Sequence, residues 1–276
     1  MKKQTKLVAV LSTAALLAIG ASMTSFAATG WAEEDGTWVY YNRDGERATD
    51  SWKKSGNNWY YLDSDGEMAI DQLIEDGDNY YYVDINGVMA SNQWVAIENE
   101  DAGEDDEPEH YWYYFQANGK ALTNGDNDKV SLKTINGKKY AFDQYGAMVA
   151  EWSLDSDDEK EASDNVGHYA ASTNQSVASV SEAWQGKGNY AQYSKAWKYF
   201  NSVEDGARVS KGWFKVVPAE YLNEGKYDDD EDFWYYADGS GNLYAGEFKT
   251  IKGKKYAFRD DGRMLNGLKF IKEDEA

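Results

Sequence analysis

The chain has 276 residues and a formal net charge of −21 at pH 7, and 15% of its residues are aromatic. An acidic surface repels nucleic acid and anionic lipid head groups, so neither is expected as a partner. The chain has no cysteine and only two prolines, which excludes a disulfide framework and, with the aromatic content, favours an all-β fold stabilised by packing.

The first segment of the chain has the pattern of a secretory signal peptide. Three lysines within the first six residues precede an apolar run over 7–19, and small residues follow at 25–27. The run is shorter than the roughly 20 residues that a membrane-spanning helix needs. We therefore expect residues 1–27 to be removed and the mature protein to be exported and soluble, with no membrane span.

From residue 30 onward the sequence repeats. Gly45, Gly66 and Gly87 lie 21 residues apart, each after an aromatic segment, and five later glycines follow aromatic segments in the same manner. Asp–Gly and Asn–Gly pairs, which favour tight hairpin turns, recur between the segments, so each of the eight repeats is predicted to be a β-hairpin. One hairpin alone is barely stable in water. The predicted fold is therefore an all-β solenoid of stacked hairpins over residues 30–270.

Three insertions interrupt this array, near 98–110, 154–194 and 217–232. Each falls between the first and second strand of a repeat, so we expect inserted loops that decorate one edge of the solenoid and have no core of their own. Acidic runs in them suggest Ca²⁺ as one reading, but no EF-hand spacing is present, and we interpret them as solvated loops.

Alternation along the second strand of each repeat separates two faces. One face is apolar or aromatic throughout, as at Tyr60 and Leu62, and is predicted to pack. The other face carries Trp59 and Tyr61 in the second repeat but Lys139 at the position of Trp59 in the fifth. Because a buried core does not accept lysine, we predict that this face meets solvent and that its rings bind a ligand. The alternative is that the rings pack against the neighbouring hairpin.

The pattern GW…G-x-WYY-x-x-x-G-x-M resembles the choline-binding or cell-wall-binding repeat, and residues 134–148 and 250–264 look more like glucan-binding and clostridial toxin repeats. The resemblance extends over residues 30–270. It implies a solenoid of β-hairpins with ligand sites between consecutive hairpins, each lined by two tryptophans of one repeat and a tyrosine of the next.

Carried over residue by residue, the resemblance implies two complete sites. They would use Trp31 and Trp38 with Tyr61, and Trp52 and Trp59 with Tyr82, while Met68 and Met89 would lie near the cages. Rings of this kind hold a quaternary ammonium group by their electron-rich faces. The same rings also stack on sugars, so choline and glycan both stay open as ligands.

The later repeats depart from this pattern. The third repeat has Leu73 in place of its first tryptophan. The fourth repeat keeps Trp94 and Trp112, but the tyrosine position of the next repeat is Ala141, and the seventh keeps Trp213 and Trp234, which face Ala257. The sixth repeat offers Trp152 and Trp197 with Tyr236. In that sixth repeat a long insertion separates Trp152 from Trp197. Only the first two sites are therefore expected to be complete.

Enzyme chemistry has little support in the sequence. His110 and His168 are the only histidines, both within insertions, and no nucleophile or phosphate-loop motif is present. No cofactor and no metal are expected. The sequence predicts a secreted, cell-wall-associated, non-catalytic protein that binds a bacterial cell-wall polymer, either choline-bearing teichoic acid or another glycan. The alternative is a surface adhesin or interaction protein whose acidic insertions carry the function while the repeats form a scaffold.

Overall fold

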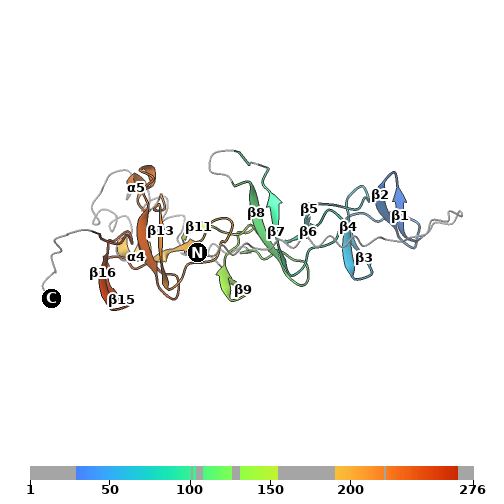
Figure 1. Ribbon diagram of the computed structural model, residues 1–276. Coiled ribbons are helices and arrows are strands. Elements are labelled where there is room, and N and C mark those ends of the chain that lie inside the picture. Colours follow the sequence, from blue (N-terminus) through green and yellow to red (C-terminus); the bar gives the residue numbers. More distant parts are fainter. Residues whose placement is uncertain are drawn as a thin grey trace. The chain divides into compact units, whose positions relative to one another are not determined.

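The computed structural model describes six ranges of residues, which are 29–100, 102–103, 108–125, 131–154, 190–220 and 222–266 (Figure 1). The predicted signal peptide and most of the predicted insertion at 154–194 lie outside them. The chain divides into two compact units, Met1–Thr123 with Tyr145–Ala147 and Asn124–Gln144 with Met148–Ala276. Within the described ranges, no helix is both long and apolar enough to cross a membrane.

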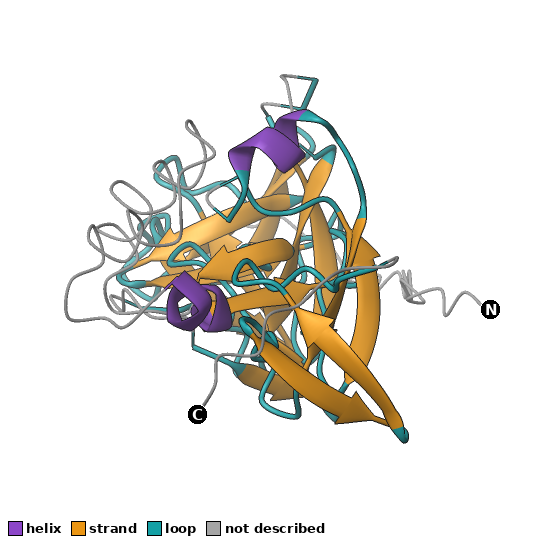
Figure 2. Cartoon of the chain, turned by 90° about the vertical axis from the view of Figure 1, so that its left-hand side faces the viewer, coloured by secondary structure: helices purple, strands orange, loops and turns teal. Residues whose placement is uncertain are grey.

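The described residues form eight two-stranded antiparallel sheets, each a hairpin of two consecutive strands. The first compact unit holds β1 (Gly30–Glu34), β2 (Thr37–Tyr41), β3 (Ser51–Ser55), β4 (Asn58–Leu62), β5 (Gln72–Asp76), β6 (Asn79–Val83), β7 (Gln93–Glu98) and β8 (His110–Phe115). The second holds β9 (Lys133–Ile135), β10 (Lys138–Tyr140), β11 (Glu151–Leu154), β12 (Trp197–Phe200), β13 (Gly212–Val216), β14 (Phe233–Ala237), β15 (Glu247–Ile251) and β16 (Lys254–Phe258). Among the described residues strands far outnumber helices, as Figure 2 shows, so the predicted all-β class of hairpin repeats is confirmed.

The Asp-x-x-Gly phrase after the second strand of several hairpins closes a turn. The carboxylate of Asp63 accepts the backbone N–H groups of Asp65 and Glu67, both at 2.9 Å. The carbonyl of Asp63 accepts the N–H of Gly66 at 3.1 Å, and Gly66 has a φ of +77°. A left-handed backbone of this kind favours glycine, which explains why a glycine recurs at this place in the repeat.

The segment after each such turn joins its hairpin to the preceding one. The N–H of Met68 donates to the carbonyl of Trp38 in the preceding hairpin at 2.8 Å, while the N–H of Ala69 donates to Tyr61 of its own hairpin at 2.9 Å. The same pattern of bridges recurs in both compact units. Hydrogen bonds between nearest neighbours thus stack the hairpins within each unit, as a repeat fold requires.

The structure confirms the packing face and corrects part of the prediction for the other face. Tyr60 is 2% exposed and Leu62 is fully buried, whereas Trp59 is 41% exposed. However, Trp112 is only 5% exposed, although it occupies the position of Trp59 in the fourth hairpin. The ring of His110, at the start of the longer strand β8, lies 5.6 Å from the Trp112 ring, so this position is covered locally.

The described parts of the insertions are more than loops. They contain α4 (Tyr190–Ala196) and α5 (Glu224–Asp228). Tyr193 of α4 and Leu222, just before α5, are fully buried in one cluster with Trp197 of β12. These segments therefore add to the core of the second compact unit, because their apolar side chains cover the hairpin of β11 and β12.

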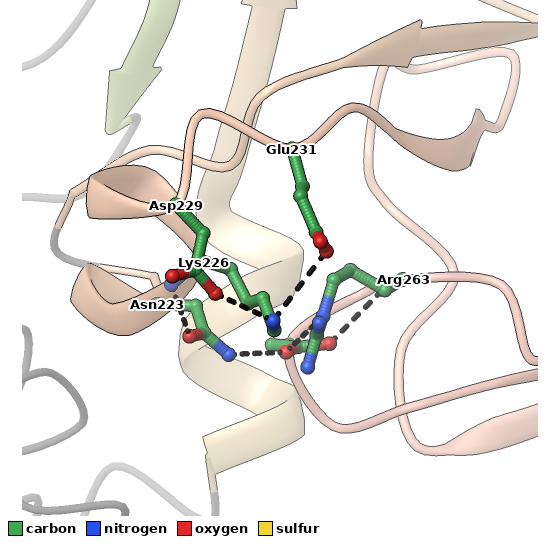
Figure 3. A network of polar contacts seen from close by, with 6 residues as sticks. Asn223, Lys226, Asp229, Glu231 and Arg263 are labelled. Carbon is green, nitrogen blue, oxygen red and sulfur yellow. Dashed lines mark hydrogen bonds and ion pairs between the residues drawn. The ribbon is translucent and has the colours of Figure 1, made fainter.

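A polar network fastens α5 to the turn after β16 (Figure 3). The carboxylate of Asp261 accepts the side-chain amide of Asn223 at 2.9 Å and the Nε of Arg263 at 2.6 Å. Asp261 is buried, so the guanidinium of Arg263 compensates its charge inside the protein. The ammonium group of Lys226 lies 2.7 Å from the carboxylate of Asp229. The insertion at 217–232 is thereby held against the last described hairpin.

Candidate aromatic binding site

Consecutive hairpins within a compact unit face each other through four side chains, and we call each such set a junction. One hairpin contributes a first-strand residue and the tyrosine opposite it, and the next hairpin contributes a cross-strand pair from its other face. Four junctions of the described units contain a tryptophan: the first (Trp31, Tyr40, Lys53, Tyr60), the second (Trp52, Tyr61, Ile74, Tyr81), the sixth (Trp152, Tyr199, Phe214, Tyr235) and the seventh (Trp213, Tyr236, Lys249, Tyr256).

Trp52 lies at the centre of the second junction. Its ring centroid is 5.1 Å from that of Tyr61 in the same hairpin and 5.1 Å from that of Tyr81 in the next. The indole Nε1 donates to the carboxylate of Asp76 at 3.1 Å. Ile74 is buried beneath these rings. Two consecutive hairpins therefore bring three aromatic rings and one carboxylate into contact.

Carboxylates give the second junction a negative electrostatic potential. Burial raises the pKa of the Tyr61 hydroxyl, and the charges of Asp50, Asp76 and Asp63 raise it further. Burial and the charge of Asp76 likewise raise the pKa of Tyr81. Because each carboxylate opposes the formation of a second negative charge, the same field favours a bound cation.

The first junction has the same rings and a different electrostatic content. The ring of Trp31 lies 5.4 Å from Tyr40 and 5.3 Å from Tyr60. The ammonium group of Lys53 stands over the Tyr40 ring, 5.0 Å from its centroid, and donates to the side-chain oxygen of Asn42 at 3.0 Å. The ammonium group of Lys53 therefore already covers the face of one tyrosine ring in this junction.

The tyrosine ring that contacts each expected tryptophan from the next hairpin is one residue away from the tyrosine that the resemblance implies. The resemblance implies Tyr61 as the partner of Trp31, whereas the ring that meets Trp31 from the next hairpin is Tyr60. Tyr61 points to the opposite face of its hairpin, where it meets Trp52. The reason is that side chains alternate along a strand, so only one of two adjacent tyrosines can face the preceding hairpin.

The second site shows the same one-residue difference between the expected tyrosine and the one that contacts the tryptophan. Tyr81 rather than Tyr82 meets Trp52. The ring of Tyr82 lies 6.1 Å from Phe115 of the following hairpin, and its hydroxyl donates to the carboxylate of Asp71. Tyr82 therefore belongs to the next interface along the chain.

Trp38 and Trp59, the second tryptophans of the two expected sites, lie at the same position of their hairpins. Trp38 is half-buried and its carbonyl accepts the N–H of Met68. Trp59 shares a strand face with Tyr61 and is exposed, and the ammonium group of Lys54 lies 5.8 Å from its ring centroid. Trp59 thus offers a ring to solvent on the face that carries the second junction.

Met68 and Met89 fill space against the turn glycines of the following hairpins. A Cβ added to Gly87 would lie 2.9 Å from the Cε of Met68, and one added to Gly119 would lie 2.5 Å from the Cε of Met89. These distances are shorter than van der Waals contact, so a Cβ at either glycine would force the end of the methionine side chain to move. The structure therefore gives both residues a packing position between hairpins, and their contact with a ligand stays a prediction.

The sixth junction is filled by the chain itself. The Nε1 of Trp152 donates to the carbonyl of Val217 at 2.8 Å, and its ring lies 6.4 Å from that of Trp197. Trp197 is buried together with Leu222 of the insertion. These two tryptophans lie together despite the long segment between them, but Trp197 is buried and Trp152 is partly buried.

The seventh junction brings together rings that sequence reasoning had discounted. The ring of Trp213 lies 5.0 Å from Tyr236, 4.8 Å from Tyr256 and 6.3 Å from Trp234. Trp234 is 43% exposed, close to the value for Trp59. Sequence reasoning paired this hairpin with Ala257 and so missed Tyr256, which is one residue away on the opposite face. The alternation of side chains along the strand could have identified Tyr256, because it places Tyr256 and Ala257 on opposite faces.

Comparison with known proteins identifies the repeat. Residues 48–94 match the family model of the choline-binding repeat. Among solved structures, CbpJ from Streptococcus pneumoniae TIGR4 is similar, with 22% identity, a TM-score of 0.50, and coverage of 86% of this chain and 58% of that one. Choline binding protein F from Streptococcus pneumoniae gives 24% identity and a TM-score of 0.49, with coverage of 87% and 58%.

A curated relative, glucosyltransferase-S of Streptococcus mutans serotype c, is 27% identical over 172 residues, with coverage of 56% of this chain and 11% of that protein. The chain thus spans less than two thirds of the length of each relative named here. The family match at residues 48–94 contains the whole second junction. Residues 48–94 carry the choline-binding repeat, and the predicted resemblance to this family is confirmed.

Proposed function

We propose that the protein is a secreted, non-catalytic, cell-wall-associated binding protein that attaches to a quaternary ammonium group, such as the choline of a teichoic acid. The second and seventh junctions are its binding sites. The observation that carries this proposal is the second junction, where Trp52 lies between two tyrosine rings and donates to Asp76. It falls within the residues that match the choline-binding repeat.

The chemistry of the second junction suits this ligand class. A quaternary ammonium group has no N–H to donate, so ring faces and nearby negative charge must hold it. The rings of Trp52, Tyr61 and Tyr81 supply the faces, and Asp76 supplies the charge. A neutral sugar stacks on the same rings and can donate a hydroxyl hydrogen bond to the carboxylate, but it gains no charge–charge attraction from it, which is why choline is favoured over an uncharged glycan.

The seventh junction adds a second site of similar form. Trp213 lies between the rings of Tyr236 and Tyr256, and exposed Trp234 stands at its rim. A cell-wall polymer carries many copies of its choline group. Two weak sites on one chain raise the overall affinity for such a polymer, because the second binding event becomes intramolecular.

Titration calorimetry with choline tests the proposal on the full chain. Trp59 is not one of the three junction rings, but its exposed ring lies on the same strand face as Tyr61. Replacing it by alanine is expected to weaken binding at the second junction by roughly 1–2 kcal/mol, if its ring closes over the cation held by Trp52, Tyr61 and Tyr81 as the proposal requires. Trp59 is exposed, so the variant is expected to fold normally. Lys139→Ala is the matched control, since Lys139 occupies the same position in the hairpin of β9 and β10 and is exposed.

Two outcomes contradict the proposal. The first is that the wild-type protein binds no choline and is retained instead by an uncharged glucan such as dextran. The second is that Trp59→Ala binds choline as the wild type does while Lys139→Ala does not. Retention on a quaternary-amine resin, with elution by choline, provides the same comparison without calorimetry.

A further inference from the structure

The first and second junctions share three aromatic residues and differ in the fourth residue. The shared residues are Trp31, Tyr40 and Tyr60 in the first junction and Trp52, Tyr61 and Tyr81 in the second. The fourth residue is Lys53 in the first and Ile74 in the second, each opposite the tyrosine of its own hairpin. One substitution therefore separates a junction that holds an internal cation from one that does not.

The contacts of Lys53 show what holds its ammonium group. It lies 5.0 Å from the centroid of the Tyr40 ring and 3.0 Å from the side-chain oxygen of Asn42. No carboxylate of the described residues lies within ion-pair distance of it, although the chain has 49 acidic residues. A ring face and a neutral amide hold this cation, and the ring face is the group that would receive an external quaternary ammonium group.

We propose that Lys53 closes the first junction to external cations by holding its own ammonium group there. The inference rests on the proposed function, because it concerns which aromatic junctions accept a quaternary ammonium group. A ring face that already carries a cation binds a second one poorly, since the two positive charges repel. Lys53 is also attached to the site by its side chain, so a dissolved ligand competes with a group of high effective concentration.

The other junctions show that the position of Lys53 decides what fills each one. In the sixth, Phe214 takes this position and stacks on Tyr199 at 4.9 Å. In the seventh, Lys249 takes it, but its ammonium group is 2.8 Å from the carboxylate of Glu247 and stands over Tyr244. The charge of Lys249 is therefore paired, and the ring that it covers is not the one opposite Trp213. Among the described residues, Lys53 is the lysine that stands over a tyrosine facing a junction tryptophan.

The experiment follows the indole N–H signals of Trp31 and Trp52 by NMR during a choline titration of the full chain. Lys53→Ile gives the first junction the residue found in the second. In the wild type, the Trp52 signal is expected to move and the Trp31 signal to stay. In Lys53→Ile both signals are expected to move, and calorimetry is expected to show one additional site per chain. Trp31→Phe in the Lys53→Ile background is expected to remove that additional site.

The outcomes separate this inference from the proposed function. A Trp52 signal that choline leaves unmoved in the wild type contradicts choline binding at the second junction. A Trp31 signal that moves in the wild type, or stays in Lys53→Ile while Trp52 responds, overturns the closure by Lys53. A measurement without ligand also tests it: the ε protons of Lys53 are expected to show an upfield ring-current shift that Tyr40→Leu removes. If that shift is missing in the wild type, the ammonium group does not occupy the ring and the inference fails.

Discussion

At the scale of single residues, Trp59 and Tyr60 are neighbours in sequence with different environments. Trp59 is 41% exposed on the face that carries the second junction, whereas Tyr60 is 2% exposed and its ring lies 5.3 Å from Trp31 of the preceding hairpin. Alternation along β4 places them on opposite faces. One ring is therefore available to a ligand, and the other joins two hairpins.

Replacing Tyr60 by alanine is expected to destabilise the fold. The loss should be about 3 kcal/mol, because a buried aromatic side chain leaves a cavity that its neighbours only partly refill. Thermal and urea unfolding followed by circular dichroism measure it. The folded fraction is expected to keep choline binding at the second junction, since Tyr60 faces away from Trp52. Full stability together with lost binding in Tyr60→Ala would show that the two faces are assigned the wrong way round.

At the scale of elements, a methionine–glycine contact joins consecutive hairpins. Met68 lies against Gly87 in the turn of the next hairpin, and Gly87 has a φ of +73°. Met89 and Gly119 repeat this contact one hairpin later. The G-x-M phrase of the repeat is thus explained by packing, because the methionine of one hairpin occupies the space that a Cβ in the next would need.

Replacing Gly87 by alanine is expected to destabilise the first compact unit by roughly 2–4 kcal/mol, from left-handed backbone strain and from the clash with Met68. Gly77→Ala is the matched control, because Gly77 has a φ of +61° and nothing lies within 4 Å of its added Cβ. The control should lose only the strain, about 1–2 kcal/mol. Adding Met68→Ala to Gly87→Ala should recover part of the difference in urea unfolding. Equal losses for the two glycine variants would mean that the methionine contact contributes nothing.

At the scale of the whole molecule, the repeat made the hairpins predictable from sequence. The 21-residue spacing of Gly45, Gly66 and Gly87 placed strands and turns, because those glycines have the positive φ values that such turns require. Alternation also identified Tyr60 as a packing residue. These features depend on local backbone geometry, which the residue types of each repeat determine.

Features that depend on contacts between hairpins were harder to predict. The repeat pattern does not say which face of a hairpin meets the preceding one, so Tyr61 was expected where Tyr60 lies. The role of Lys53 depends on its reach to Tyr40 in another hairpin. The helices α4 and α5 occur once each and have no repeat to support them. Tertiary packing determines all of these features, and one sequence contains little direct signal for it.

The many half-buried and buried tyrosines at the junctions make the stability of the whole chain depend on alkaline pH. Burial, with the charges of Glu151 and Asp232, raises the pKa of Tyr199 to about 12. Burial also raises the pKa of Tyr235 well above its usual value, and the charge of Asp261 adds to this while that of Arg263 lowers it. In the unfolded chain these hydroxyls titrate near the ordinary tyrosine value of about 10.

Above pH 10 the unfolded chain therefore binds fewer protons than the folded one, so the free energy of unfolding must fall as pH rises. The stabilising contribution is complete below pH 10, and the share of Tyr199 is lost as pH rises through its folded value of about 12. Urea unfolding at intervals from pH 8 to pH 12, with tyrosinate absorbance recorded in parallel, measures this loss.

Tyr199→Phe and Tyr235→Phe are each expected to reduce the slope of the free energy of unfolding against pH, because phenylalanine keeps the ring and removes the titrating group. In addition, the hydroxyl of Tyr235 is buried without a hydrogen-bond partner among the described residues, so Tyr235→Phe is expected to be neutral or stabilising by about 1 kcal/mol at pH 7. A free energy of unfolding that stays constant from pH 8 to pH 12, or a slope that neither substitution changes, would contradict the view that these tyrosines stabilise the chain as neutral, buried rings.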